Sequence, residues 1–323
     1  MEPLSFPSEG KQASPTLKTL ETCKKIISSM SLPEENGWND FQPLCFYKGF
    51  WWHPYFIERS LFAQENFKVQ PRDIFICSSP KTGTTWLKAL TFATLTRTHF
   101  KNSPSPLLSK VSHDCMPFME IDCIENPFIP ANDFPLCATH VPFSSLPKSV
   151  IDSGCKIIYI CRDPKDSFVS LWHHTNKLRP KNNEKICLEE AFELYCNGKS
   201  PYGPYWEHVL GYWKASLENP DKLLFLKYED MMRDTAFYLK KLGEFIGHPF
   251  SLEEEKEAAV EEVMRLCSFK HLSNLEVNKT EKSVFFRKGE VGDWISLLTL
   301  EMGERLDNIM EEKLSGSGLT FKS

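Results

Sequence analysis

The residues with the clearest chemical use lie in a short polar loop between an apolar run and a helical pattern. The run from Ile74 to Cys77 has the length and β-branched character of a buried parallel strand, and the helical pattern begins near Trp86. Loop N–H groups and the positive end of a helix dipole converge on one point in such an arrangement, and Lys81 adds a full charge there. The string PKTGTTW therefore predicts a site for phosphate or sulfate.

The residue order in this loop differs from that of a nucleotide-binding P-loop. The Walker pattern places its Lys directly after the last Gly, whereas Lys81 precedes Gly83. A phosphoryl-transfer enzyme with a degenerate loop would also need a carboxylate for Mg²⁺ at a strand end. That reading, and a plain turn without a ligand, are the alternatives to the anion site.

Two further candidates follow apolar runs. His140 stands between a short apolar stretch and a Pro-marked turn, and a neutral imidazole is well suited to accept a proton from a hydroxyl. Arg162 follows the run from Lys156 to Cys161, and an arginine can make a forked contact with a phosphate. The alternative for Arg162 is an ion pair with Asp163 or Asp166.

A third apolar run, Leu223 to Lys227, ends at Tyr228. Right-handed crossovers between parallel strands would bring Lys81, Arg162 and Tyr228 to one carboxyl edge of the sheet. The pattern predicts an α/β fold, a three-layer sandwich whose central, mainly parallel sheet is flanked by helices. A late segment from Arg287 to Gly289 joins two cations to a glycine, either as a surface turn or as a flap over a phosphate.

The remaining chain predicts one large domain. Residues 1–40 are expected to be a partly flexible tail with one helix at 16–29, and residues 41–323 a single domain. Further helices are expected at 200–217, 233–246 and 252–266, and a long excursion of loops at 100–134. The aromatic side chains of 41–62 are either core or walls of an apolar acceptor pocket.

Composition narrows the function classes. Hydrophobic residues make up 41% and charged residues 25% of the 323 residues, as in soluble globular proteins, and the net charge is −5 without a Lys/Arg block. Nucleic acid is therefore not an expected partner. The sequence has no signal-peptide core and no apolar run long enough to span a membrane, so a cytoplasmic enzyme without a membrane partner is expected. The 11 scattered cysteines are expected to be reduced thiols, with no metal site.

Six strings in order resemble the soluble, plant-type sulfotransferases that use 3′-phosphoadenosine 5′-phosphosulfate (PAPS). They are PKTGTTWLKAL, ATHVPFSSLP, YICRDPKDSFVSLW, LKYEDM, CSFKHLSNLEVNK and RKGEVGDW. The resemblance implies a P-loop-like cradle for the 5′-phosphosulfate, no metal, and release of adenosine 3′,5′-bisphosphate (PAP). It also implies an acceptor hydroxyl on a small, largely apolar molecule of plant secondary metabolism: a flavonoid, a steroid-like hormone, a hydroxylated fatty-acid derivative or a desulfated thioglucoside.

The same resemblance assigns roles to residues. His140 would be the general base, and Lys81 would stabilise the leaving group. The cradle would be Lys81, Thr82, Gly83, Thr84, Thr85 and Trp86. The 3′-phosphate would contact Arg162 and Ser170, with Arg287, Lys288 and Gly289 closing over it. The adenine would lie among Trp86, Tyr228 and Phe269, with a polar contact from Ser268.

The sequence also departs from the family pattern. Ser79 and Thr82 replace an aromatic residue and a Ser of the loop, and Ala138 stands where animal members often carry a Lys. The family's dimer motif after the GDW string is only partly present, so a monomer and a weak homodimer both stay open. A non-catalytic PAPS-binding protein is a further alternative, against which the pairing of His140 with Lys81 argues.

Overall fold

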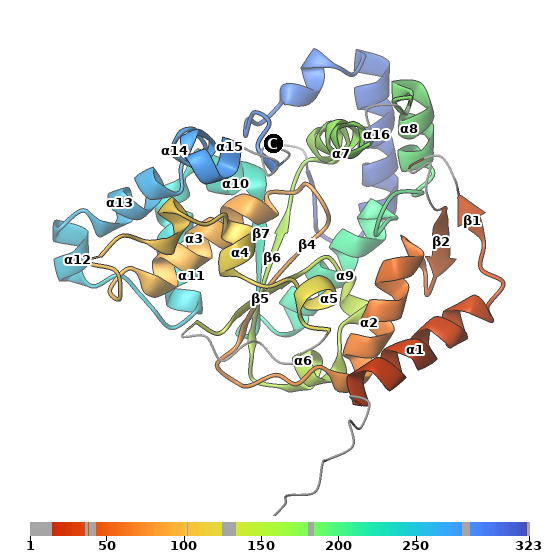
Figure 1. Cartoon of the computed structure of the whole chain (residues 1–323). Helices are drawn as coiled ribbons and strands as arrows, with labels where there is room; N and C mark the ends of the chain where they lie inside the picture. The colour runs from red at the N-terminus through yellow and green to blue at the C-terminus, as the bar shows by residue number, and fades with distance from the viewer. Residues whose placement is uncertain are drawn as a thin grey trace, which may run out of the picture.

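A four-stranded parallel sheet lies at the centre of the molecule (Figure 1). This computed structural model describes residues 15–35, 38, 43–101, 103–124, 134–179, 184–279 and 285–321. The strand order is β5-β4-β6-β7, with β4 at Ile74–Ser78, β5 at Leu136–Thr139, β6 at Lys156–Cys161 and β7 at Leu223–Lys227. The three strands predicted from apolar runs are confirmed, and β5 ends directly before His140.

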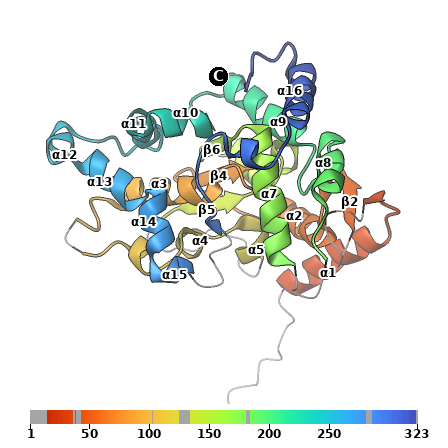
Figure 2. The ribbon, with the colours of Figure 1, turned by 90° about the horizontal axis from the view of Figure 1, so that it is seen from above.

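Helices cover both faces of this sheet, which confirms the three-layer α/β fold. Alternate residues of a strand point to opposite faces, so Ile76 packs in one core and Phe75 in the other. Figures 1 and 2 show α3, α11 and α13 on the first face and α7, α9 and α16 on the second. Their bounds are Thr84–Thr96, Thr235–Phe245 and Ala259–Leu266 for the first set, and Pro164–Leu178, Tyr205–Glu218 and Leu300–Leu314 for the second.

Local signals explain where several helices begin. Asp163 caps α7, because its side chain accepts a hydrogen bond from the N–H of Lys165, and Pro164 occupies the first helical position. The single helix predicted at 252–266 is wrong. The structure has α12 at Leu252–Lys256 and then α13, separated at Ala258, whose φ is +58°. The break lets α13 bury Val260 and Val263 while α12 buries no side chain.

A small antiparallel sheet was not foreseen. It pairs β1 (Glu34–Glu35), β2 (Leu44–Tyr47) and β3 (Phe50–Trp52), and the two-residue turn Lys48-Gly49 has positive φ at both positions, as tight hairpins require. The helix predicted at 16–29 is confirmed as α1 (Pro15–Ser28), which lies beside α2 (Pro54–Asn66) (Figure 1). Residues 1–14 of the predicted tail lie outside the described residues, and the domain boundary at 40 stays a prediction.

The other elements are short. They comprise η1 (Pro106–Leu108), α4 (Ser112–Cys115), α5 (Met119–Asp122), η2 (Phe143–Ser145), α6 (Lys148–Asp152), α8 (Leu188–Cys196), α10 (Tyr228–Arg233), α14 (Phe269–Asn274), α15 (Glu276–Lys279) and η4 (Asp293–Ser296). Those at 106–122 match the expected excursion of short turns, of which 102 and 125–133 lie outside the described residues. Within the part of the chain that is described, no helix is long and apolar enough to cross a bilayer.

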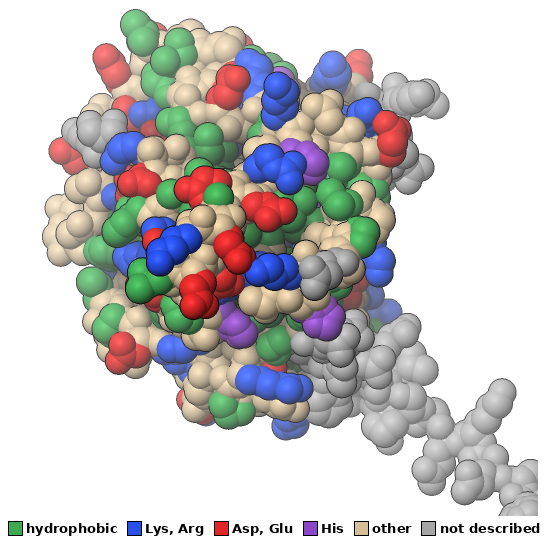
Figure 3. All heavy atoms as spheres, turned by 90° about the vertical axis from the view of Figure 1, so that its left-hand side faces the viewer, with side chains coloured by type: hydrophobic (Ala, Val, Ile, Leu, Met, Phe, Trp, Pro, Cys, Tyr) green, Lys and Arg blue, Asp and Glu red, His purple; other side chains and the backbone are tan. Residues whose placement is uncertain are grey.

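The face that carries α12 mixes acidic and basic side chains (Figure 3). Glu254 pairs with Arg97 at 2.8 Å, Glu255 with Lys240 at 2.8 Å, and one carboxylate beyond α12 pairs with Lys101. These pairs hold α12 against α3 and α11 although α12 contributes nothing to the core. All 11 cysteines are free thiols, as the sequence predicts.

Candidate active site

The loop after β4 turns sharply into the N-terminus of α3. Lys81 has φ +70° and Gly83 has φ +109°, so Gly83 occupies a backbone region that side chains disfavour. A Cβ at position 83 would lie 2.7 Å from the ring of Tyr228. At the start of α3, the hydroxyls of Ser78 and Thr84 are hydrogen-bonded at 2.6 Å. The loop is therefore fixed against the sheet by close packing and by a buried hydroxyl pair.

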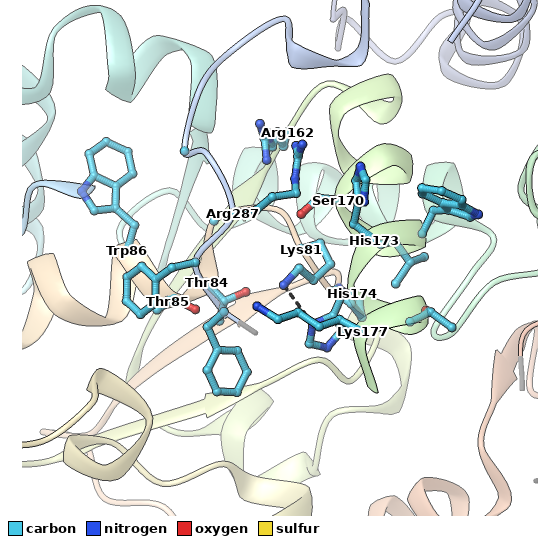
Figure 4. A pocket seen from close by; sticks show the side chains of 18 of the residues that line it. Lys81, Thr84, Thr85, Trp86, Arg162, Ser170, His173, His174, Lys177 and Arg287 are labelled. Atoms are coloured by element: carbon cyan, nitrogen blue, oxygen red, sulfur yellow. Dashed lines mark hydrogen bonds between the residues drawn. The ribbon is translucent and has the colours of Figure 1, made fainter. Parts of the chain in front are cut away.

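A pocket of about 1160 Å³ opens above this loop (Figure 4). It is lined by most of the residues that the sequence singled out: Lys81, Gly83, Thr84, Thr85, Trp86, His140, Arg162, Ser170, Tyr228, Ser268, Phe269, Arg287, Lys288 and Gly289. Thr82 does not line it, because its buried hydroxyl donates to the carbonyl oxygens of Ser79 and Ile160. Of the aromatic cluster at 41–62, Phe56 lines the pocket, whereas Trp51 and Trp52 are core.

Two arginines line one end of the pocket, and each pairs with its own buried carboxylate. Arg162 donates to Asp166 at 3.3 Å and to the carbonyl oxygen of Glu290 at 2.6 Å. Arg287 pairs with Asp293, which also accepts from Lys288 at 2.5 Å. The ion pair of Arg162 with Asp166 is thus present, and because Arg162 also lines the pocket, its contact with a phosphate stays a prediction.

The loop that carries Arg287 is tied to α7. Asp166 is fully buried, and its carboxylate accepts hydrogen bonds from the N–H groups of Gly292 at 2.8 Å and Trp294 at 2.9 Å. The Nε–H groups of Arg162 and Arg287 are buried and have no hydrogen-bond partner among the described residues. Buried donors of this kind are costly unless a ligand supplies the acceptor, so this end of the pocket fits an anion with several oxygens.

Lys81 lies among these cations. Its Nζ donates to Nδ1 of His174 at 3.3 Å. Burial, then the charges of Arg287, Arg162 and Lys177, lower the pKa of Lys81 to about 8. Cations crowded together in a low-dielectric pocket repel one another, and an anion between them relieves that repulsion. The cluster thus favours a multiply charged anion.

An aromatic slot adjoins the cations. The rings of Trp86 and Tyr228 lie 5.4 Å apart, and the Tyr228 hydroxyl donates to the carbonyl oxygen of Gly289 at 3.0 Å. Gly289 has φ +69°, and a Cβ there would lie 2.5 Å from the ring of Phe269. The Ser268 hydroxyl accepts from the N–H of His271 and so caps α14. These side chains enclose space suited to a flat ring.

His140 is held at three points. Its Nδ1–H donates to the carbonyl oxygen of Ser78 at 2.7 Å, so Nε2 carries the lone pair. Its N–H donates to Oε1 of Glu120 at 2.9 Å, and its carbonyl oxygen accepts from Nε2–H of His208 at 2.9 Å. Burial, more than any neighbouring charge, lowers the pKa of His140 to about 3. The imidazole is therefore neutral at physiological pH and lines the pocket as an acceptor.

Several pocket residues were missed from the sequence. His173, His174 and Lys177 line the pocket from the second half of α7, which already carries Ser170 (Figure 4). Their spacing from Ser170 is three, four and seven residues, which places them on one face of a helix. Once Ser170 is assigned to the site, this spacing in the sequence indicates that the three residues lie on the same side of the helix. His113 is different, because it comes from α4 in the long excursion and no local pattern marks it.

The model of the sulfotransferase domain matches residues 71–318. The chain belongs to the sulfotransferase family. Cytosolic sulfotransferase 17 of Arabidopsis thaliana is 50% identical over 318 residues, covering 93% of this sulfotransferase and 90% of the relative. A flavonol sulfotransferase-like protein of Flaveria bidentis is 50% identical over 286 residues, covering 85% and 92%. The resemblance drawn from the six strings is thereby confirmed.

Solved structures share the fold of this sulfotransferase. A crystal structure of an Arabidopsis thaliana protein proposed to be a steroid sulphotransferase has a TM-score of 0.74 at 37% identity, covering 98% of this chain and all of that one. Mouse sulfotransferase SULT7A1, complexed with PAP, has a TM-score of 0.67 at 26% identity, covering 85% and 95%.

Proposed function

We propose that this sulfotransferase transfers the sulfuryl group of PAPS to a hydroxyl of a small, largely apolar acceptor and releases PAP. The observation that carries the proposal is one pocket in which a neutral histidine, His140, shares a wall with Lys81 and a cluster of cations. The mouse relative that shares the fold binds PAP. The relative from Flaveria bidentis is named for flavonols, and the Arabidopsis relative is named cytosolic. We extend both the nucleotide and the cytosolic location to this chain.

In this proposal the donor spans the cationic end of the pocket. Arg162, Ser170 and the segment from Arg287 to Gly289 bind the 3′-phosphate, which gives the two buried Nε–H groups their acceptors. The residues from Lys81 to Trp86 bind the 5′-phosphosulfate through backbone N–H groups and hydroxyls. Thr82 contributes only its backbone, since its hydroxyl is already bonded. Trp86, Tyr228 and Phe269 enclose the adenine, with Ser268 beside it.

The reaction is an in-line displacement at sulfur. The acceptor oxygen forms a bond to sulfur while the bond from sulfur to the bridging oxygen of the 5′-phosphate breaks. Nε2 of His140 accepts the hydroxyl proton, and Lys81 stabilises the charge that grows on the bridging oxygen. Negative charge brought by the donor opposes the repulsion that Lys81 exerts on protonated His140, so donor binding strengthens the base.

The acceptor is proposed to be a flavonol-like phenol or a steroid-like alcohol. Apolar side chains line the pocket beside the cations, among them Phe56, Ile121, Leu171 and Trp172. Such a surface suits a flat, apolar body better than a sugar or peptide, because a polar body would leave its groups without partners. Hydroxylated fatty-acid derivatives and desulfated thioglucosides are the competing acceptors in a transfer assay.

The proposal is tested by thermal stabilisation with PAP, compared with ATP plus Mg²⁺. Saturation at 100 times the dissociation constant adds about 2.7 kcal/mol to the free energy of unfolding. We expect a clear shift with PAP and little with ATP, followed by PAPS-dependent transfer to a flavonol or a steroid. A shift with ATP alone would replace this proposal with phosphoryl transfer. Binding of PAP without transfer to any of the four acceptor classes would indicate a non-catalytic nucleotide-binding protein.

A further inference from the structure

His140 lies at the end of an edge strand. In the order β5-β4-β6-β7, β5 has one neighbour, so alternate N–H groups on its outer side need other partners. The N–H of Ala138 donates to the carbonyl oxygen of Pro117 at 2.9 Å. The next outward N–H, two residues on, belongs to His140, and Oε1 of Glu120 accepts it at 2.9 Å. The side chain of Glu120 thus accepts the outward N–H of His140, whereas a backbone carbonyl accepts that of Ala138.

A carboxylate is an expensive group for this purpose. Glu120 is 1% exposed, and its Oε2 has no hydrogen-bond partner among the described residues. Burial raises the pKa of Glu120, which reflects the cost of keeping its charge away from water. Lys88 is also buried and interacts with Glu120 electrostatically, but its Nζ donates to the carbonyl oxygen of Met116 at 2.8 Å. A backbone carbonyl or an amide would cap the same N–H at lower cost, so fold stability alone does not account for Glu120.

Glu120 connects His140 to a second pocket residue. The hydroxyl of Tyr202 donates to the same Oε1 at 3.4 Å, and the Tyr202 ring lies 5.7 Å from the imidazole. Tyr202 has φ +60°, an unfavourable backbone for a tyrosine that its surroundings must enforce. Its N–H donates to the carbonyl oxygen of Trp51 at 2.7 Å. One oxygen atom therefore joins the backbone of His140 to the aromatic side chain beside its imidazole.

We propose that Glu120 is a positioning residue for sulfuryl transfer, which aims Nε2 of His140 by holding its backbone N–H and the Tyr202 hydroxyl on one oxygen. Nδ1 of His140 is already bound to Ser78, so a rotation of the residue is the motion that Glu120 prevents. The inference rests on the proposed role of His140 as the general base. A misplacement of about 1 Å in a reacting group can cost about 100-fold in rate.

The test compares Glu120→Ala with Glu120→Gln. The Gln amide keeps an oxygen that can accept both hydrogen bonds, so we expect it to retain kcat within about threefold. The Ala variant should lower kcat by about 10- to 100-fold, as for partners that orient catalytic ligands, with KM for PAPS and the PAP-induced thermal shift unchanged. Equal losses in both variants would show that charge, not positioning, is at work and would overturn the proposal. Should Glu120→Ala not fold, Glu120→Asp, which withdraws the oxygen by one methylene, takes its place in the comparison.

Asp122→Ala is the matched control. Asp122 lies on the same short helix, α5, and accepts the N–H of Phe118 at 2.6 Å without touching His140. It should lower the melting temperature and leave kcat in place. A loss of kcat in the control as large as that in Glu120→Ala would mean that loosening of α5 explains both, and the proposal would fail.

A double variant separates positioning from a direct effect. In a His140→Ala background, Glu120→Ala should leave the residual rate unchanged, because nothing remains to be aimed. An additional 10-fold loss there would show that Glu120 acts on the acceptor or the fold, and would refute the inference. If the wild-type enzyme transfers no sulfuryl group at all, the proposed function itself fails, and that outcome is seen before any variant is made.

Discussion

Replacing Asp166 by Asn tests whether the proposed phosphate-binding segment from Arg287 to Gly289, called the flap below, depends on the hydrogen bonds that join its loop to α7. The carboxylate accepts three hydrogen bonds, from Gly292, Trp294 and Arg162. An Asn side chain offers one oxygen and one NH₂, so the Trp294 N–H can stay bound while the other two donors face an amide nitrogen. Each hydrogen bond to a charged group contributes about 1.5–3 kcal/mol. Because these hydrogen bonds preorganise the segment for the phosphate, we expect loss of one such contribution to weaken PAP binding by about 10-fold and by no more than about 100-fold.

Titration calorimetry with PAP measures that loss, and steady-state kinetics at saturating PAPS measures whether chemistry is spared. We expect kcat within about threefold of wild type, because Asp166 contacts neither Lys81 nor His140. Asp307→Asn is the control. Asp307, on α16, pairs at 2.5 Å with Lys165, which lies on α7 next to Asp166, but Asp307 is not part of the flap. An unchanged dissociation constant with a lowered kcat would refute the assignment of the flap to the donor phosphate.

Two further predictions concern the reacting groups. His140→Ala should keep the PAP-induced thermal shift and lose about 10²–10⁴ in transfer rate, and near-normal turnover would contradict its role as base. The pKa of Lys81 near 8 gives a signed pH dependence: the protonated amine attracts the donor, so PAP affinity should be highest below pH 8 and fall as the pH rises toward 9. Lys81→Met should bind PAP more weakly and lose that part of the dependence, and an unchanged pH profile in the variant would assign it to another group.

Local patterns were enough to predict the sheet edge. The runs from Ile74 to Cys77 and from Ile157 to Cys161 are apolar because their strands are covered on both faces, and a Pro at the first turn of α7 marks its start. Because β4 and β6 are parallel neighbours, the loops that follow them bring Lys81 and Arg162 to the same edge of the sheet. The loop between β4 and α3 could be predicted without long-range information, since strand, turn and helix N-terminus are consecutive in the chain.

Contacts between distant segments left no such pattern. The Asp166 carboxylate joins α7 to N–H groups more than 120 residues away, as the separations of 126 and 128 show. In the sequence Glu120 is one acidic residue in a proline-rich excursion, and its two partners, His140 at the edge of the sheet and Tyr202, lie 20 and 82 residues away. The break at Ala258 was also invisible, because a helical pattern at 252–266 continues through it and tertiary packing decided otherwise.

The covering of β5 also bears on how the protein behaves at high concentration. An open sheet edge is a template for strands of other molecules, and natural proteins block such edges. Pro117 and Glu120 occupy the outward N–H groups of Ala138 and His140, so this side of the sheet offers no donors there to an incoming strand. Glu120, which we propose to position His140, thus also protects this edge of the sheet against pairing with another molecule.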